Sequence, residues 1–312
     1  MPDIRSGAVR PLLKWAGGKR QLLPELRRFY PRRFDRYIEP FLGSGAVFLD
    51  LYNDGLLAGR DVRLSDINAD IIGCYRAVRD SPGEVIAALA ELDAAYRSGG
   101  AAEYYKVRDG AFNPERRRLM AAGDPAASYP ATLAAMLIFL NRTGFNGLFR
   151  LNARGEFNVP AGRYANPKIC DAPNILAWSA ALGDSRVSLE VSPFDAALAE
   201  GRRGDFIYLD PPYAPLSGTA RFTSYTAGGF DGAQQEQLQR AVIALADRGA
   251  SVLLSNSVAP QIRLLYAGRG AARMAGFRAT TVAARRAINS RAASRGPIRE
   301  YLITNVPRCK LA

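Results

Sequence analysis

The chain has 312 residues, 48% of them hydrophobic, which suits one large domain or a core domain with a sizeable insertion. It contains no histidine, which excludes histidine-based acid–base relays and the usual zinc ligand sets, and its three cysteines are scattered, so no disulfide framework is indicated. The formal net charge of +13 favours a polyanionic partner, nucleic acid first, although an arginine-rich composition alone would also explain it. With no apolar run long enough to cross a bilayer and no secretory signal at the N-terminus, we expect a cytoplasmic protein.

The first part of the chain alternates between strand and helix patterns. The segments at 35–40 and 62–68 predict strands that end at Glu39 and Asp66, and residues 46–59 between them have helical apolar spacing. Asn68 is expected to cap a helix that runs through Arg79. This order of strand, helix, strand and helix predicts a parallel sheet.

The alternation breaks from residue 81 to residue 166. Alanine-rich helical segments are followed by a predicted buried helix at 131–140 and then by a segment rich in Gly, Asn, Arg and aromatic residues at 141–164. The pair Asn146-Gly147 in that segment signals a tight turn. We therefore predict a module inserted into the α/β domain.

The α/β pattern resumes after the inserted module. Strand patterns occur at 186–191, 205–210, 251–256 and 300–305. Asp231 is expected to cap an amphipathic helix that follows it. The sequence thus predicts an α/β fold with a doubly wound sheet and a mostly helical insertion.

A glycine-rich turn follows the first predicted strand, between Glu39 and Phe48. Gly43 and Gly45 would let the backbone approach a ligand at the N-terminus of a helix. Phe48 stands where a dinucleotide fingerprint has its third glycine, which disfavours NAD. Asp66 ends the next predicted strand and can accept hydrogen bonds from ribose hydroxyls. A nucleoside-type cofactor is therefore favoured over a turn without function.

An earlier segment combines Trp15, Gly17, Gly18 and Lys19. These residues supply a flat apolar face, a flexible turn and a cation, which can wrap a charged amino-acid moiety and an aromatic base. A capped helix start with a surface tryptophan is the alternative, and the segment alone does not decide between them.

The strand predicted at 205–210 ends in Asp210-Pro211-Pro212-Tyr213. Prolines have no N–H, so this corner offers mainly acceptors, and a residue before proline is held extended. The Asp210 carboxylate and the Pro211 carbonyl can then converge on an exocyclic –NH₂ group, with the Tyr213 ring as a surface on which a base stacks. A proline-rich loop without function is the alternative.

Five motifs in order resemble those of the Dam-type DNA adenine-N6 methyltransferases, which methylate adenine in GATC. They are "LKWAGGK", "EPFLGSG", "LSDIN", "NRTGFNGLFRLNARGEFNVPAGRY" and "DPPYAPLSGTARFTSY". The resemblance spans residues 11–305. It implies a Rossmann-like methyltransferase domain formed by residues 1–75 and 168–312, a target-recognition domain at 76–167, and S-adenosylmethionine as cofactor.

The resemblance also implies which residues meet the cofactor and the reacting base. The cofactor residues would be Trp15, Gly17, Gly18, Lys19, Glu39, Phe41, Gly43, Gly45, Asp66, Phe194 and Asp210, although Phe194 is equally suited to the core. The catalytic residues would be Asp210, Pro211, Pro212 and Tyr213. The adenine amino group cannot reach such a pocket from within a duplex, so the base would have to be flipped out.

The resemblance assigns the DNA contacts mainly to the segment 141–164. Arg150 would bind a guanine, and Leu148 and Pro160 would contact a thymine methyl group. Lys14 and Tyr164 would contact the outer base pair, and Phe145 and Asn146 would enter the base stack. Asn152 and Arg163 would contact phosphate. Phe145 replaces the usual tyrosine. We also expect a mobile, phosphate-binding loop at 285–299 and a lid over the target base at 214–230.

The expected partner is double-stranded DNA, bound by a monomer without a metal, in association with the nucleoid. The nearest alternative is an adenine methyltransferase of a restriction–modification system with another target. A protein-glutamine methyltransferase is less favoured, because such enzymes usually have Asn at position 210. A nicotinamide oxidoreductase is disfavoured, because Phe48 replaces the third glycine of the dinucleotide fingerprint. A DNA-binding regulator without activity would have no use for the cofactor motifs.

Overall fold

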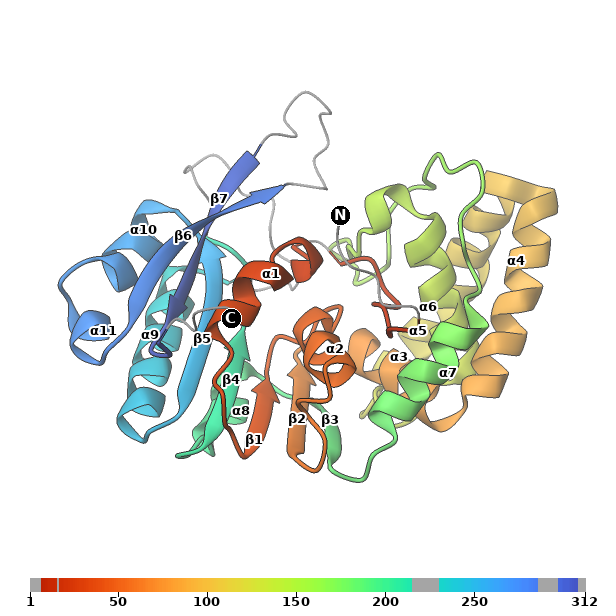
Figure 1. The fold of residues 1–312 in the computed structure, drawn as a ribbon. Coiled ribbons are helices and arrows are strands. Elements are labelled where there is room, and N and C mark those ends of the chain that lie inside the picture. The colour runs from red at the N-terminus through yellow and green to blue at the C-terminus, as the bar shows by residue number, and fades with distance from the viewer. Residues whose placement is uncertain (1–6, 16, 215–229, 286–296, 308–312) are drawn as a thin grey trace. The chain divides into compact units, whose positions relative to one another are not determined.

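The computed structural model describes residues 7–15, 17–214, 230–285 and 297–307 (Figure 1). The chain divides into two compact units, each assembled from several segments. The first unit contains residues 1–18, 43–56 and 68–191, and the second contains residues 19–42, 57–67 and 192–312. The target-recognition domain predicted at 76–167 lies within the first unit, and the two domain limits remain a prediction.

The second unit is built on a largely parallel sheet. Its strands are β1 (Arg36–Glu39), β2 (Asp61–Asp66), β4 (Asp205–Leu209), β5 (Ser251–Ser257), β6 (Arg278–Arg285) and β7 (Pro297–Thr304). They lie in the order β2-β1-β4-β5-β7-β6, and β7 runs antiparallel to both neighbours. The strand order reverses between β1 and β4, and open α/β sheets bind ligands beyond the carboxyl ends of their strands at such a reversal.

A buried ion pair sets the register at this reversal. Arg36 of β1 donates from Nε and Nη2 to the two carboxylate oxygens of Asp205 in β4, at 3.0 and 2.7 Å. The two residues are also register partners in the sheet. Because the pair holds the amino ends of β1 and β4 level, the residues that follow both strands emerge at one edge of the sheet.

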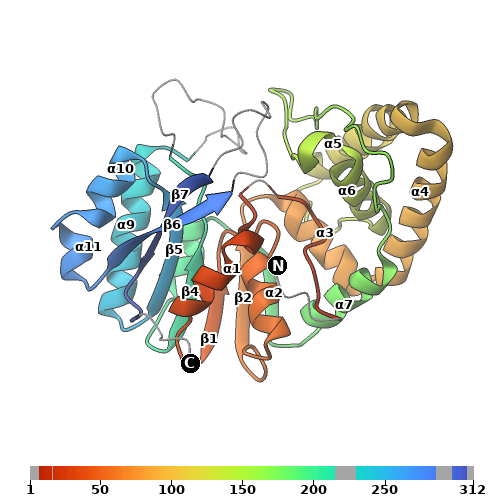
Figure 2. The same cartoon turned by 45° about the horizontal axis from the view of Figure 1, so that its top comes forward.

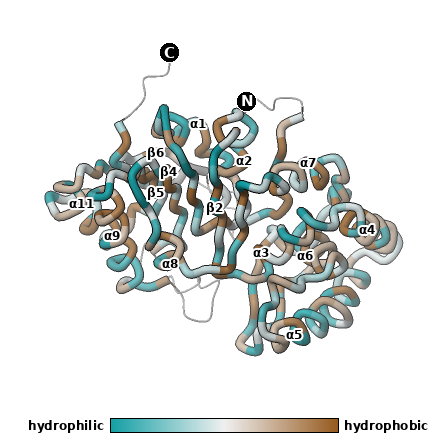
Figure 3. The backbone as a smooth tube through the Cα atoms, turned by 90° about the horizontal axis from the view of Figure 1, so that it is seen from below, coloured by the Kyte–Doolittle hydropathy of each residue, from teal (hydrophilic) through white to brown (hydrophobic). Residues whose placement is uncertain are grey.

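Helices of the second unit pack on these strands. They are α1 (Leu23–Leu26), α8 (Phe194–Ala199), α9 (Gly232–Asp247), α10 (Pro260–Ile262) and α11 (Ala271–Met274). Figures 1 and 2 show α9, α10 and α11 together on one side of the strands, and brown hydrophobic stretches follow β4 and β5 in Figure 3. Leu238, Val242 and Leu245 of α9 belong to the same buried core as strands β4 and β5.

The cap predicted for α9 is confirmed. Asp231 accepts a hydrogen bond from the Gln234 backbone N–H at 3.0 Å, and the Gln234 side chain accepts one from the Asp231 N–H at 3.0 Å. This reciprocal capping box satisfies two backbone donors at the start of the helix.

The first unit is mostly helical, as predicted for the insertion. It contains α2 (Ala46–Asn53), α3 (Ala69–Asp80), α4 (Pro82–Tyr105), a π-helix (Lys106–Phe112), α5 (Asn113–Ala121), α6 (Ala131–Thr143), α7 (Ala172–Leu182) and strand β3 (Val187–Val191). Asn68 caps α3 by accepting a bond from the Asp70 N–H at 3.0 Å. The buried helix predicted at 131–140 is α6, nearly all of whose apolar side chains are buried.

A hairpin follows α6, and we call its residues 144–161 the recognition hairpin. It is held by isolated antiparallel bridges between Gly144 and Ala161 and between Leu151 and Phe157. Asn146 and Gly147 adopt left-handed conformations with φ of 55° and 62°, which confirms the predicted tight turn.

Three segments differ from the expectation. The helix expected at 46–59 ends at Asn53, because Gly55 adopts φ of 70°, which a continuing helix does not allow. Strand β6 was not expected, since its small and β-branched residues lack a strict alternation. The strand expected at 300–305 begins earlier, at Pro297.

Two loops fall largely outside the described residues. The limits predicted for the loop at 285–299 are wrong, because Arg285 is the last residue of β6 and residues 297–299 are the first residues of β7. Residues 286–296 lie outside the described residues, as do residues 215–229 of the expected lid. In the described part of the chain, no helix combines the length and apolar composition that a membrane crossing requires.

Candidate active site

The corner after β4 carries a carboxylate whose charge is costly. All five residues of β4 are buried, and Asp210 follows them directly. Burial raises the pKa of Asp210 to about 6, the nearby Lys19 ammonium acts against this rise, and the Glu300 carboxylate adds to it. The Lys19 Nζ lies 2.8 Å from Asp210 Oδ1, so the carboxylate has a direct cationic partner.

Lys19 joins three groups of the second unit in what we call the Lys19 cluster. Its side chain is only 3% exposed. Besides Asp210, the Nζ lies 3.9 Å from a Glu300 oxygen and 4.6 Å from the centre of the Tyr213 ring. The Tyr213 hydroxyl donates to the same Glu300 oxygen at 2.5 Å. One ammonium group is thus shared by two carboxylates and an aromatic face.

Sequence reasoning placed Lys19 in the cofactor motif and missed Glu300. A signal for Glu300 was present, because it is the single acidic residue among eleven arginines and lysines between Gln261 and Ala312. A single acidic residue in so basic a segment suggests that its carboxylate forms an ion pair. Which cation it meets depends on β7 lying next to β5, and the sequence does not show that adjacency.

The backbone of the corner is held by side chains from α9 and β5. The Gln235 amide donates to the Pro212 carbonyl at 3.1 Å and itself accepts from the Asn256 amide at 3.0 Å. The Ser257 hydroxyl donates to the Ala214 carbonyl at 2.9 Å. Within the described residues nothing donates to the Pro211 carbonyl. The corner therefore presents the Pro211 oxygen and the Asp210 carboxylate as acceptors beside Tyr213.

Of the remaining predicted residues of the second unit, Glu39, Phe41 and Asp66 lie at the carboxyl ends of β1 and β2, and Phe194 begins α8. Glu39 ends β1 and accepts from the Tyr37 hydroxyl at 2.7 Å, and Asp66 ends β2. The rings of Phe41 and Phe194 stack at 5.6 Å between centroids, and Phe194 also belongs to the buried core. Two carboxylates and a stacked aromatic pair therefore surround the edge where ligands of such sheets bind.

In the first unit the structure brings Trp15 and the glycine turn together. Gly43 adopts φ of 46°, and a Cβ there would lie 2.9 Å from the Trp15 ring, so this position requires glycine. Gly45, with φ of 64°, precedes α2, and Gly18 donates its N–H to the Trp15 carbonyl at 3.0 Å. Gly17 also adopts a left-handed conformation, with φ of 81°.

Lys14 is fastened to the recognition hairpin by Asn141. The Asn141 side chain accepts from the Lys14 N–H at 2.7 Å and donates to the carbonyls of Lys14 and Gly147 at 2.8 and 2.9 Å. The Lys14 ammonium lies 4.2 Å from the centre of the Tyr164 ring. Burial and the Arg142 charge lower the pKa of Lys14. The two residues expected to read the outer base pair are thus neighbours.

The hairpin exposes some predicted DNA contacts and buries their neighbours. Phe145, Arg150, Pro160 and Arg163 are exposed, while Asn146, Leu148 and Asn152 are partly exposed. Phe149 and Phe157 are buried with 5.7 Å between ring centroids, so these two form a small core inside the hairpin.

Two asparagines shape the polar face of the hairpin. The Arg150 Nε donates to Asn158 Oδ1 at 2.7 Å, which aims the guanidinium group. Asn152 bonds Glu156 through its backbone N–H at 2.8 Å and through its amide at 3.1 Å. Asn141 and Asn158 were not predicted, because Asn141 bonds the backbone of Lys14 far away in the chain and Asn158 bonds the Arg150 side chain, and neither contact has a sequence signature.

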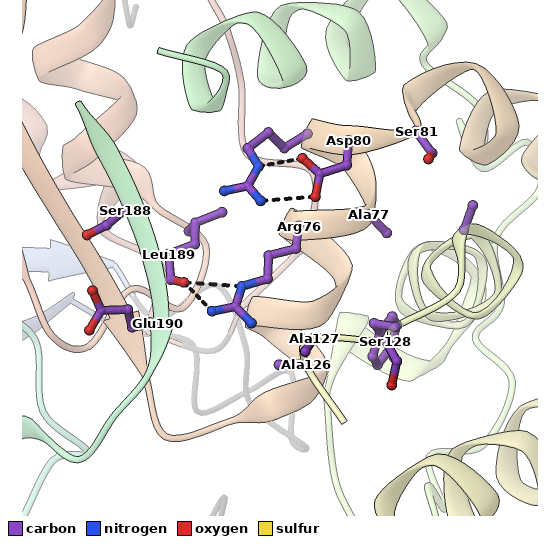
Figure 4. A pocket seen from close by; sticks show the side chains of 13 residues that line it. Arg76, Ala77, Asp80, Ser81, Ala126, Ala127, Ser128, Ser188, Leu189 and Glu190 are labelled. Atoms are coloured by element: carbon purple, nitrogen blue, oxygen red, sulfur yellow. Dashed lines mark hydrogen bonds and ion pairs between the residues drawn. The ribbon is translucent and has the colours of Figure 1, made fainter. Parts of the chain in front are cut away.

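A hollow of about 640 Å³ also lies in the first unit, between α3, the segment before α6, and β3 (Figure 4). Its arginines are already occupied. Arg76 donates from both Nε and Nη2 to the Leu189 carbonyl, and Arg79 forms two bonds to the Asp80 carboxylate. None of the predicted site residues lines it. In the described parts of the chain, no three acidic or cysteine side chains gather in a way that could hold a metal ion.

Residues 15–288 match the model of the D12 class N6 adenine-specific DNA methyltransferases. This chain belongs to that family. The prediction of an adenine-N6 DNA methyltransferase is therefore confirmed, with DNA as substrate and S-adenosylmethionine as methyl donor.

Curated relatives in this family are similar over most of their length. The chain is 36% identical to the type II methyltransferase M1.LlaDCHI of Lactococcus lactis subsp. cremoris, over 95% of each chain. It is 38% identical to the type II methyltransferase M.MjaIII of Methanocaldococcus jannaschii, over 80% of this chain and 84% of the relative. It is 35% identical to the DNA adenine methylase of Escherichia coli K12, over 79% and 80% respectively.

The residues at the sheet edge suit this cofactor. S-adenosylmethionine carries two cationic groups, an adenine ring and two ribose hydroxyls. The second unit offers the carboxylates of Glu39 and Asp66 and the stacked rings of Phe41 and Phe194. Acidic groups and flat apolar rings are the complement that these ligand groups require.

We expect glycine to matter more at position 147 than at position 155. Both adopt left-handed conformations, so Gly155→Ala should cost about 1 kcal/mol of unfolding free energy. A Cβ at Gly147 would also lie 2.4 Å from the Lys14 Cβ, whereas one at Gly155 meets nothing within 4 Å. Gly147→Ala should therefore cost roughly 3 kcal/mol. Urea unfolding of the two variants measures the difference, and equal costs would refute this contact.

Proposed function

We propose that this enzyme transfers a methyl group to N6 of an adenine flipped out of duplex DNA, and that its target sequence is GATC. The observation that carries the proposal is the corner at Asp210–Tyr213. It presents the Asp210 carboxylate and the Pro211 carbonyl, to which nothing donates within the described residues, beside an aromatic ring. An exocyclic amino group has two N–H donors, and these two acceptors match them.

The proposed role of the corner is to make the adenine amino nitrogen nucleophilic. Its lone pair is delocalised into the ring, so the free amine reacts poorly. Hydrogen bonds from the amino group to Asp210 and to the Pro211 carbonyl favour a tetrahedral nitrogen with a localised lone pair. Tyr213 stacks on the base and holds its plane, which aligns the nitrogen for in-line attack.

The proton leaves after transfer rather than before it. S-adenosylmethionine supplies the methyl group when bound. The methylated nitrogen is cationic and far more acidic than the free amine, so it releases its proton without a strong base. The Asp210 carboxylate needs only to accept a hydrogen bond and to stabilise the positive charge that develops on the nitrogen.

The proposed cofactor contacts follow the two sheet-edge carboxylates and the glycine turns. Asp66 binds the ribose hydroxyls. The aromatic faces of Phe41 and Phe194 lie against the adenine ring of the cofactor. Glu39 attracts the cationic part of the cofactor. In the first unit, Trp15 and the turns of Gly17, Gly18, Gly43 and Gly45 complete the set.

The proposed reading of GATC uses the recognition hairpin. Arg150 pairs with a guanine in the major groove, where a guanidinium group can bond O6 and N7 together. Its Asn158 bond supports this role because the side chain is already aimed. Leu148 and Pro160 contact a thymine methyl group, and Phe145, 39% exposed, enters the base stack with Asn146.

The other proposed DNA contacts are Asn152 of the hairpin and three residues outside it. Lys14 and Tyr164, which are neighbours, read the outer base pair, and Asn152 and Arg163 contact phosphates. We propose that the enzyme acts on nucleoid DNA as a monomer. A restriction–modification methyltransferase with another target is the second candidate, because two of the similar relatives bear type II methyltransferase names.

The target sequence is tested by methylation in vivo. The chain is expressed in a host that lacks adenine methylation, and the host DNA is cut with two GATC nucleases of opposite methylation sensitivity. We expect protection from the one and cutting by the other. Adenine methylation without any change at GATC would support the restriction–modification candidate instead.

The proposed role of Asp210 predicts how the rate depends on pH. Burial raises the pKa of Asp210 to about 6. Only the ionised carboxylate both accepts a strong hydrogen bond from the amino group and stabilises the positive charge that develops on its nitrogen. Below pH 6, kcat/KM should therefore fall about tenfold per pH unit, and above pH 7 it should be level. Asp210→Ala should be inactive throughout. A wild-type profile that stays level down to pH 5 would contradict the role.

The proposed division of DNA contacts predicts different losses for two exposed arginines. Arg150→Ala should relax discrimination at one base pair, costing about 1–3 kcal/mol of specificity. Arg163→Ala should weaken binding to all sequences alike and reduce the salt dependence. Binding to GATC and to single-mismatch duplexes at several salt concentrations separates the two. Equal losses of discrimination in both variants would refute this division.

A further inference from the structure

Glu300 is placed where its charge is hard to explain by folding alone. It lies in β7, opposite Ser257 of β5 and Val282 of β6, and only 7% of its surface is exposed. The pairing of β7 uses backbone groups and does not need this side chain. Burying a carboxylate costs free energy, so it persists where its charge meets a partner.

Glu300 contacts Tyr213 directly and Asp210 through Lys19. Its Oε2 accepts from the Tyr213 hydroxyl at 2.5 Å and lies 3.9 Å from the Lys19 ammonium, which in turn contacts Asp210 at 2.8 Å. A phenylalanine at position 213 would offer the same ring to a base. The Tyr213 hydroxyl is thus needed only for its hydrogen bond to Glu300, and this bond attaches the ring to strand β7.

We infer that Glu300 is a positioning residue for methyl transfer, which holds the Tyr213 ring in its plane and shares Lys19 with Asp210. This inference rests on the proposed roles of Asp210 and Tyr213. A hydrogen bond to an ionised acceptor is short and directional, so it restricts rotation of the phenol. The shared ammonium restrains the Asp210 carboxylate, so both acceptor and stacking surface are set before the base arrives.

The charges around Asp210 show which effect the Glu300 charge itself exerts. Lys19 faces Asp210 from the 3₁₀ turn Lys19–Gln21, Glu300 faces it from β7, and the neutral phenols of Tyr213 and Tyr208 lie nearby. With one cation and two carboxylates, the cluster carries a net charge of −1 when both acids are ionised. Removing the Glu300 charge therefore makes ionisation of Asp210 easier.

Four variants and one control separate positioning from a purely structural role. Glu300→Ala removes both contacts, Tyr213→Phe removes only the hydroxyl, and the double variant completes a thermodynamic cycle. Glu300→Gln keeps an acceptor for the phenol and removes the charge. Glu236→Gln, an exposed acid of α9, is the matched control for net charge.

The measurement is the single-turnover methylation rate of a short GATC duplex, with the binding constants for DNA and S-adenosylmethionine. We expect Glu300→Ala to lower the rate about tenfold to a hundredfold, as loss of a charge-assisted hydrogen bond implies, with both binding constants changed less than about threefold. Tyr213→Phe should cost a smaller factor, and the double variant should be no slower than Glu300→Ala. Glu300→Gln should shift the acid limb of the rate profile to lower pH, while Glu236→Gln leaves it in place.

The outcomes distinguish this inference from the proposed function. If the wild type methylates adenine and Asp210→Ala does not, but folded Glu300 variants behave as Glu236→Gln does, the positioning role alone is wrong. It is also wrong if Glu300→Ala and Tyr213→Phe lower the rate by independent factors that multiply. If the wild type methylates no adenine, or if Asp210→Ala keeps its rate, the proposed function fails and the inference fails with it.

Discussion

The ion pair between Lys19 and Asp210, at 2.8 Å, is the interaction on which the site depends. A carboxylate at the end of a fully buried strand would otherwise take up a proton and become a poorer acceptor. The cation opposes that tendency without removing it, so the pKa of Asp210 stays near 6. The carboxylate is then ionised at neutral pH yet remains in an environment where its hydrogen bonds are strong.

The rest of the second unit supports that pair. The buried bond between Arg36 and Asp205 keeps β1 and β4 in register at one edge, and their ends therefore project from the other. Gln235 and Ser257 hold the corner by its carbonyls, and Glu300 holds it by the Tyr213 hydroxyl. A site held by three elements pre-organises its acceptors, which in the proposed function lowers the cost of alignment during transfer.

The recognition hairpin follows a similar principle in the first unit. Phe149 and Phe157 face inward as a small core, and several polar side chains lie outward in a set geometry. Asn141 and Asn158 restrain Lys14 and Arg150, the two cations proposed to read bases. A restrained side chain loses less conformational entropy on binding, so rigidity in the hairpin favours discrimination between sequences.

Local sequence patterns were sufficient to predict much of the secondary structure and the family of this protein. The strands, the caps at Asn68 and Asp231, the turn at Asn146-Gly147 and the family motifs all depend on neighbours in sequence, so they were predictable. Strand β6 and the start of β7 were not, because the small residues of β6 show no strict alternation and residues 297–299 of β7 are paired with that same weakly patterned strand. Glu300 shows a second limit. Its sequence reveals an isolated acid, but only the insertion of antiparallel β7 beside β5 brings that acid to Tyr213 and Lys19. The sequence by itself therefore determined the family, the fold class and the acceptor corner, whereas tertiary structure decided which charges meet, because ion pairs form across space and leave no spacing in the chain.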